Sequence, residues 1–183
     1  DPTALSVSPT QLAAEVKQTI INYADDYLNR FNKVCKYSSI VTQVDRSNTA
    51  ITSNDTTLAV YYNLVPNIYG EASYSFSIYN QINPGILSTY FNVNGITESV
   101  RFKNSGTSIH LYTAANTIVK RDVGSIVVKT GTININGIVI SGYQGNAIRF
   151  YMSTVNKDIV GTRTMVLKLN PDDIDITPLL DNR

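Results

Sequence analysis

Tryptophan is absent from the 183 residues, and cysteine and histidine occur once each. One cysteine excludes an intrachain disulfide and is typical of a reducing compartment. One Cys and one His are too few for a zinc site within the chain. A nucleophilic triad would need His110 as its base. Because SIHLYT indicates a strand, we interpret His110 as half-buried with one satisfied nitrogen, and Cys35 as a buried or semi-buried small side chain.

Charge is also scarce: charged residues make up 16% of the chain, against a usual share of about 25%. Asn, Ser and Thr replace them, which favours β-rich structure and wet protein contacts. The net charge is +1 and the basic residues are scattered, so we expect no nucleic-acid partner. No apolar run is long enough to span a membrane, and no signal peptide is visible. The chain begins at Asp1, so we expect a piece of a longer protein.

The first third of the chain contains a strong helix signal. Ser8 and Gln11 form a capping box, and Pro9 suits the first helical position. Apolar residues then recur every three or four positions, which predicts a helix over about 9–31 with one buried face. The residues of that face are Leu12, Val16, Ile20, Tyr23, Tyr27 and Phe31.

The segments around this helix complete a β-α-(α)-β pattern. ALSV at 4–7 alternates like a strand, and TTLAVYYNLVP at 56–66 indicates another. KYSSIVTQVD at 36–45 fits a short helix capped by Ser38 or Ser39, although its β-branched residues also allow a strand.

After Pro66 the apolar period changes to two, and short runs are separated by turn signals such as Asn94-Gly95 and Asn136-Gly137. Such spacing predicts a mostly antiparallel sandwich or barrel-like β domain. We expect strands that include TMVLKL at 164–169. The predicted fold class is α+β, with an α/β unit at 1–66 and a β-rich domain at 67–183.

The stretch VGSIVVKTGTININGIVISG, residues 123–142, contains four glycines. Their spacing fits neither a dinucleotide fingerprint nor a phosphate loop, and no helix pattern follows them. We therefore predict that Gly124, Gly131, Gly137 and Gly142 permit turns or bulges, and that the chain has no cofactor. The acidic run in NPDDIDI, residues 170–176, lacks the glycine and distal Glu of a calcium loop, so we expect a solvated face and no metal site.

Tyrosine is abundant, with twelve residues in the chain. Tyrosine is enriched at protein interfaces, and a sugar-stacking platform is less favoured without tryptophan. We predict contact surfaces in the strands at 61–79 and in the terminal segment 164–178. The candidate interface residues are Tyr61, Tyr62, Tyr69, Tyr74 and Tyr79.

The last sixty residues carry an ordered set of motifs. They are VG-x-I at 123–126, TG-x-I-x-I-x-G-I-x-I at 130–140, a basic and apolar strand at 147–152, DIVGTRTMVLKL at 158–169 and a closing DIDI. Upstream, the long helix is followed by KYS, a turn centred on Asp45, and I-x-S-N-D at 51–55. In these motifs the sequence resembles the C-terminal region of the baseplate wedge subunit of T-even-like contractile-tailed bacteriophages, in the baseplate J-like group. The resemblance is loosest from about 66 to 120.

This resemblance implies a structural virion protein and not an enzyme. Subunits of that family associate with themselves and with other wedge proteins, and linked copies form a ring that supports sheath contraction. The implied location is the virion tail baseplate, assembled in the host cytoplasm.

Two alternatives remain open from the sequence. One is a receptor- or glycan-binding β module of a phage tail or adhesin. The other is a β-rich hydrolase that uses Glu71 and Glu98 as a carboxylate pair, although both residues lie in turn-like segments.

Overall fold

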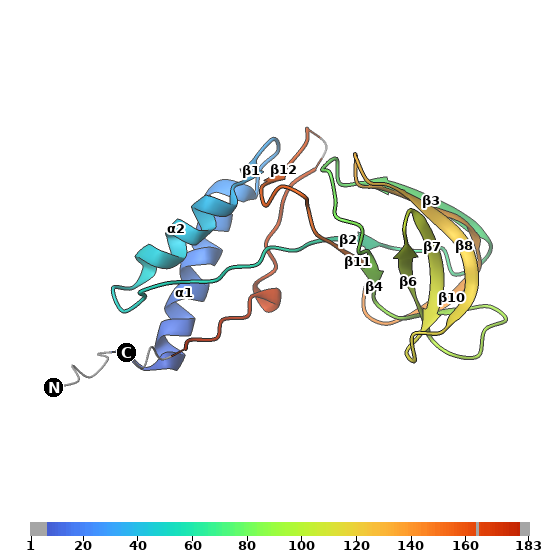
Figure 1. The fold of residues 1–183 in the computed structure, drawn as a ribbon, viewed down its shortest axis with the longest axis horizontal. Coiled ribbons are helices and arrows are strands. Elements are labelled where there is room, and N and C mark those ends of the chain that lie inside the picture. The colour runs from blue at the N-terminus through green and yellow to red at the C-terminus, as the bar shows by residue number, and fades with distance from the viewer. Residues whose placement is uncertain (1–6, 164, 180–183) are drawn as a thin grey trace. The chain divides into compact units, whose positions relative to one another are not determined.

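The computed structural model describes residues 7–163 and 165–179. The chain forms two compact units (Figure 1). The β unit is Leu58–Lys157, and the helical unit combines Asp1–Thr57 with Asp158–Arg183. The predicted α+β class is confirmed: a long N-terminal helix precedes mostly antiparallel β structure. The domain boundary near 66 stays a prediction, and most of the strand expected at 4–7 lies outside the described residues.

Helix α1 (Pro9–Tyr23) begins at the predicted capping box. The Gln11 backbone N–H donates to Ser8 Oγ at 3.2 Å, and the Ser8 N–H donates to Gln11 Oε1 at 3.1 Å. These bonds satisfy backbone donors that the first helical turn leaves without partners. A π-helical turn, η1 (Ala24–Leu28), continues the helix, which therefore ends three residues before the predicted Phe31.

The predicted aromatic face is wrong in its second half. Val16 and Ile20 are buried as expected, but Ala24 and Leu28 continue the buried face, while Tyr27 is 58% exposed. Successive steps of four residues place Ala24 and Leu28 in line with Ile20. The Tyr23 and Tyr27 rings instead stack on each other, with centroids 5.3 Å apart. Their polar hydroxyls favour this location because it keeps them near water.

The second predicted helix is present as α2 (Tyr37–Ser47), which settles the helix-or-strand alternative for 36–45. Its N-cap is Lys36, so the expected cap at Ser38 or Ser39 is wrong. The Tyr37 N–H donates instead to Asp158 Oδ1 at 2.8 Å, so a distant carboxylate satisfies this helix start.

The chain returns to the helical unit at its C-terminal end. Strand β12 (Ile159–Val160) pairs antiparallel with β1 (Val34–Cys35). Farther along, Leu169, Ile174 and Ile176 pack on a cluster formed by Val16, Ile20 and Val44. The strand expected at 164–169 is not formed by its described residues, where Val166 makes an isolated bridge to Phe31. A short 3-10 helix, η2 (Pro171–Asp173), follows.

The β unit contains one ten-stranded sheet, in which neighbouring strands pair antiparallel. The main strand order is β2-β11-β4-β6-β7-β8-β9-β3, and β5 and β10 pair beside β6. The sheet curls into a half-barrel, which agrees with the barrel-like alternative (Figure 1). The strands are β2 (Val60–Leu64), β3 (Ala72–Ser77), β4 (Leu87–Ser88), β5 (Phe91–Val93), β6 (Val100–Ser105), β7 (Ser108–Thr113), β8 (Ile118–Val127), β9 (Thr132–Ile138), β10 (Ile140–Tyr143) and β11 (Ile148–Met152).

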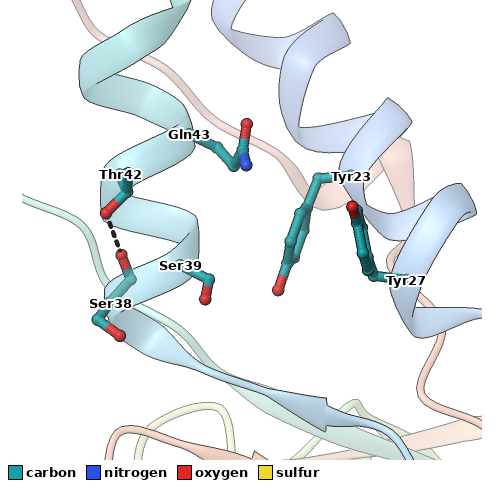
Figure 2. A pocket seen from close by; sticks show the side chains of 6 residues that line it. All are labelled: Tyr23, Tyr27, Ser38, Ser39, Thr42 and Gln43. Atoms are coloured by element: carbon teal, nitrogen blue, oxygen red, sulfur yellow. Dashed lines mark hydrogen bonds between the residues drawn. The ribbon is translucent and has the colours of Figure 1, made fainter.

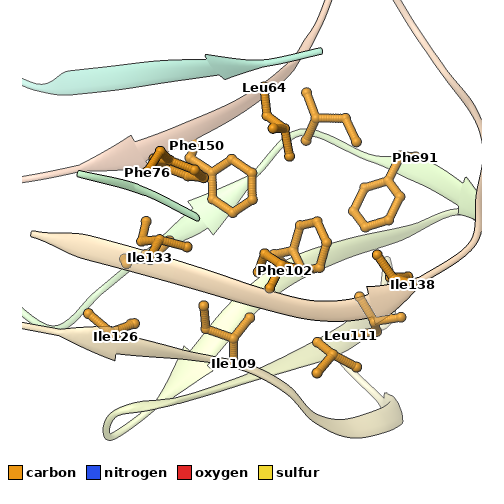
Figure 3. Close-up of a cluster of buried hydrophobic side chains, with 14 of the residues drawn as sticks. Leu64, Phe76, Phe91, Phe102, Ile109, Leu111, Ile126, Ile133, Ile138 and Phe150 are labelled. Carbon is orange, nitrogen blue, oxygen red and sulfur yellow. The ribbon is translucent and has the colours of Figure 1, made fainter. Parts of the chain in front are cut away.

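Alternate residues of these strands fill the inside of the curl (Figure 3). Phe102 is fully buried, and its ring lies 4.5 Å from Phe91 and 5.2 Å from Phe150. The two ends of the strand order also meet through side chains: Tyr62 of β2 stacks on Phe76 of β3 with centroids 4.0 Å apart. Aromatic packing therefore joins the two edge strands where the backbone ladder does not.

The four glycines of 123–142 have the predicted structural roles, with one correction. Gly131 occupies the β8–β9 turn at φ +62°, where other residues are strained. Asn136-Gly137 is not a hairpin turn, because β9 continues through it. The register with β3 shifts there, and the Gly137 N–H donates to Ser73 Oγ at 3.0 Å. A bulge, bonded to a neighbouring side chain, has replaced the expected turn.

Candidate interaction surfaces

A cavity of about 330 Å³ lies in the helical unit between α1–η1 and α2 (Figure 2). The stacked rings of Tyr23 and Tyr27 form one side, and α2 supplies the other. None of its lining residues is charged, so they include no carboxylate, imidazole or ammonium group for acid–base chemistry. The α2 side consists of Ser38, Ser39, Thr42 and Gln43.

The single cysteine and the single histidine are both buried. Cys35 lies in β1, where burial and the Asp158 carboxylate raise the pKa of its thiol to about 11. The raised pKa keeps the thiol protonated at neutral pH, although Lys33 and Lys36 lie nearby in the sequence. His110 lies in β7, and its Nδ1 accepts the Asp122 backbone N–H at 2.8 Å. His110 is thus a strand residue with one satisfied nitrogen, as interpreted, but it is buried and not half-buried.

Among the described residues, no three His, Cys, Asp or Glu side chains gather to hold a metal ion. Asp173 and Asp175 are exposed, while Ile174 and Ile176 are half-buried, which fits the predicted solvated acidic face. Glu71 precedes β3 and lies against Gly137, whereas Glu98 lies in the connection from β5 to β6. No helix in the described part of the chain is long and apolar enough to cross a membrane.

The five candidate interface tyrosines fall in three environments. Tyr62 and Tyr74 pack against the core of the β unit. Tyr61, next to Tyr62 on β2, points to the opposite side of the sheet, where its ring lies 6.2 Å from Tyr151. Tyr69 and Tyr79 lie in loops and are 94% and 60% exposed. The structure therefore does not bring the five side chains together on one surface.

One loop of the β unit carries several exposed apolar side chains. In residues 65–70, between β2 and β3, Val65 is 67% exposed and Ile68 is also exposed beside Tyr69. The loop is held by two hydrogen bonds of Asn67: its N–H donates to the Tyr74 hydroxyl, and its Oδ1 accepts the Tyr69 N–H, each at 3.0 Å. The loop therefore presents Val65, Ile68 and Tyr69 to solvent in a fixed conformation.

The predicted terminal contact surface, 164–178, is partly used inside the chain. Ile174 and Ile176 cover the helical cluster at Val16, Ile20 and Val44. Any external contact by this segment therefore falls to its exposed side, which includes Asp173 and Asp175.

Residues 2–63 match the family model for baseplate structural protein gp6, C-terminal domain III. The match confirms the resemblance to a baseplate wedge subunit of contractile-tailed phages. It supports a structural role in the phage tail baseplate. No curated protein matches the chain.

The segment that matches the gp6 domain contains α1, η1, β1, α2 and most of β2. It thus covers the part of the helical unit that precedes the β unit. The motifs at 123–176 that also carry the resemblance lie outside the matched residues.

Proposed function

We propose that this chain is part of a baseplate wedge subunit that associates with itself and with other wedge proteins to build the baseplate ring. In this role it holds partners in place and catalyses no reaction. It supports sheath contraction as a positioned part of the ring, and it is assembled in the host cytoplasm. The match of residues 2–63 to a baseplate structural domain carries this proposal.

The exposed loop at 65–70 is the surface that we propose for self-association. It presents Val65, Ile68 and Tyr69 to solvent in a conformation fixed by Asn67. Exposed tyrosines that become fully buried on binding are frequent energetic anchors of interfaces. Of the predicted tyrosines, Tyr69 has the largest exposed fraction. A partner could therefore bury more solvent-accessible surface on Tyr69 than on the other four.

Size-exclusion chromatography with light scattering at several concentrations tests this proposal. We expect a concentration-dependent dimer or larger ring fragment. Tyr69→Asp should weaken the association by about tenfold or more, because it places a charge in an apolar contact. Val65→Asp should act in the same direction. Val119→Asp introduces the same charge on an exposed valine of β8 and serves as the matched control.

A strict monomer at every concentration would contradict self-association of this chain. If that monomer also bound immobilised glycans saturably, the receptor-binding alternative would replace the assembly role. An effect of Val119→Asp as large as that of Tyr69→Asp would show that the loop is not the contact surface.

A further inference from the structure

The outward side of the half-barrel carries basic and tyrosine side chains in register. Residues directly opposite in paired strands share one side of a sheet. Strand pairing therefore places one continuous row across five strands, on the side opposite the buried Phe102 and Phe150. That row is Tyr61, Tyr151, Leu87, Lys103 and His110.

A second row runs beside the first on the same side. In β6 and β7, Arg101 pairs with Tyr112, two residues from the Lys103–His110 pair. In β11 and β2, Arg149 pairs with Asn63, two residues from the Tyr151–Tyr61 pair. The alternation of the strands thus places three cations among several tyrosines on one side of the sheet.

Each of the three cations lies over a tyrosine ring. The distance from the cation to the ring centroid is 4.8 Å for Arg149 over Tyr61 and 5.0 Å for Lys103 over Tyr112. Arg101 lies 5.2 Å from the centroid of Tyr90. These separations are within the range of cation–π attraction. We call this set of three pairs the cationic tyrosine face. Tyr112 is buried, whereas Arg101, Lys103 and Arg149 are partly exposed.

Two of these cations, Arg101 and Lys103, have no carboxylate partner in the described part of the chain. Lys103 Nζ donates to the neutral Asn116 Oδ1 at 2.7 Å, and Arg101 Nε is buried without a hydrogen-bond partner. The β unit contains seven Lys and Arg against three Asp and Glu, a net charge of +4, whereas the helical unit carries −3.

The geometry favours a carboxylate-bearing protein surface over a single-stranded nucleic acid. Base stacking needs free aromatic faces, but Tyr61, Tyr90 and Tyr112 each have a ring face covered by a cation of this chain. The guanidinium groups of Arg101 and Arg149 lie over tyrosine rings, and the planar N–H donors of a guanidinium suit carboxylate oxygens.

We propose that the cationic tyrosine face docks an acidic surface of another baseplate protein. The inference rests on the proposed structural function, and it adds the chemistry of the partner. The tyrosine rings orient the cations before contact, which reduces the conformational entropy lost on binding.

Binding of fluorescently labelled poly-L-glutamate to the full chain, followed by anisotropy across a salt series, tests the inference. We expect saturable binding that weakens as salt rises. Arg101→Gln and Lys103→Gln together should weaken binding by about tenfold. Lys129→Gln removes one charge from the exposed turn after β8, outside this face, and should change binding by less than about twofold. Because Arg101 is partly buried, Lys103→Gln alone provides a second variant with little risk to folding.

An oligothymidylate is the competing probe. If it bound more tightly than poly-L-glutamate and lost affinity in the same variants, the face would be a nucleic-acid surface and the proposal would be overturned. Absence of poly-L-glutamate binding, or an equal loss with Lys129→Gln, would also overturn it. Self-association measured in parallel separates the two proposals: a dimer without poly-L-glutamate binding removes only this inference, and a monomer that binds poly-L-glutamate removes only self-association.

Discussion

The β unit and the helical unit form their hydrophobic cores from differently arranged parts of the chain. The β unit uses one uninterrupted segment, Leu58–Lys157, and has a cluster of twenty buried apolar side chains. The helical cluster of Val16, Ile20 and Val44 is completed by partly buried residues from 169–176, more than a hundred positions later. The comparison indicates that the β unit is self-sufficient, whereas the helical unit depends on the return of the chain.

The largest expected effect is on the β unit. Phe102→Ala removes a fully buried ring that contacts Phe91 and Phe150, so it should lower the free energy of unfolding by about 3–5 kcal/mol. Hydrogen exchange resolved by peptide should show the loss of protection in Leu58–Lys157. Val119→Ala, on an exposed valine, is the control and should change stability by less than about 0.5 kcal/mol.

The same experiment tests whether the two units differ in autonomy. Because α1 and α2 have their own cluster, their peptides should keep most of their protection in Phe102→Ala. Equal loss of protection in both units would show that they unfold as one, and the contrast between them would fail.

The elements predicted correctly from the sequence are those with local causes. Ser8, Pro9 and Gln11 fix the start of α1 within four residues of chain. The end of its buried face is decided by packing, so the sequence pattern, which treats Tyr23 and Tyr27 as apolar, selected the wrong residues. Similarly, Asn136-Gly137 has the sequence of a hairpin turn, but β9 continues through it and forms a bulge where it pairs with β3.

The candidate surfaces depend even more on distant residues. The abundance of tyrosine is visible in the sequence, but neighbouring Tyr61 and Tyr62 lie on opposite sides of the sheet. Only the strand register shows which of the two side chains faces the core. The cationic tyrosine face was missed because Arg101, Lys103 and Arg149 are spread over two strands that are not adjacent in the chain. The alternation of residues along a strand predicts which side chains of that strand share one side of the sheet. The order of the strands in the sheet determines which side chains of other strands lie beside them.

Within the helical unit, two adjacent residues test the corrected face of the helix. Leu28→Ala should lower the free energy of unfolding by about 2–5 kcal/mol because Leu28 is buried. Tyr27→Ala should cost about 0.5–1.5 kcal/mol, chiefly the lost stacking on Tyr23. Urea denaturation followed by helical circular dichroism measures both. A larger loss in Tyr27→Ala would restore the face predicted from the sequence.

A chemical measurement that leaves the fold intact reports on how the helical unit closes. Cys35 lies in β1, which pairs with β12, so its environment exists only when the chain has returned. Since the pKa of Cys35 is raised from 9.0 to about 11, its thiolate fraction at about pH 8 is roughly a hundredfold lower than in an unfolded chain. Iodoacetamide should therefore alkylate the folded protein at least about a hundredfold more slowly than the protein in urea.

The same shift gives a pH dependence with a definite sign. The folded state holds the Cys35 proton more tightly than the unfolded state, so its contribution to stability is complete below pH 9.0 and is lost as the pH rises toward about 11. Asp158→Asn removes the carboxylate that contributes to the shift while keeping an oxygen that can accept the Tyr37 N–H. It should lower the pKa of Cys35 and speed alkylation. If alkylation were as fast in the folded protein as in urea, the β1–β12 pair would be open in solution, and the helical unit would not depend on the returning segment.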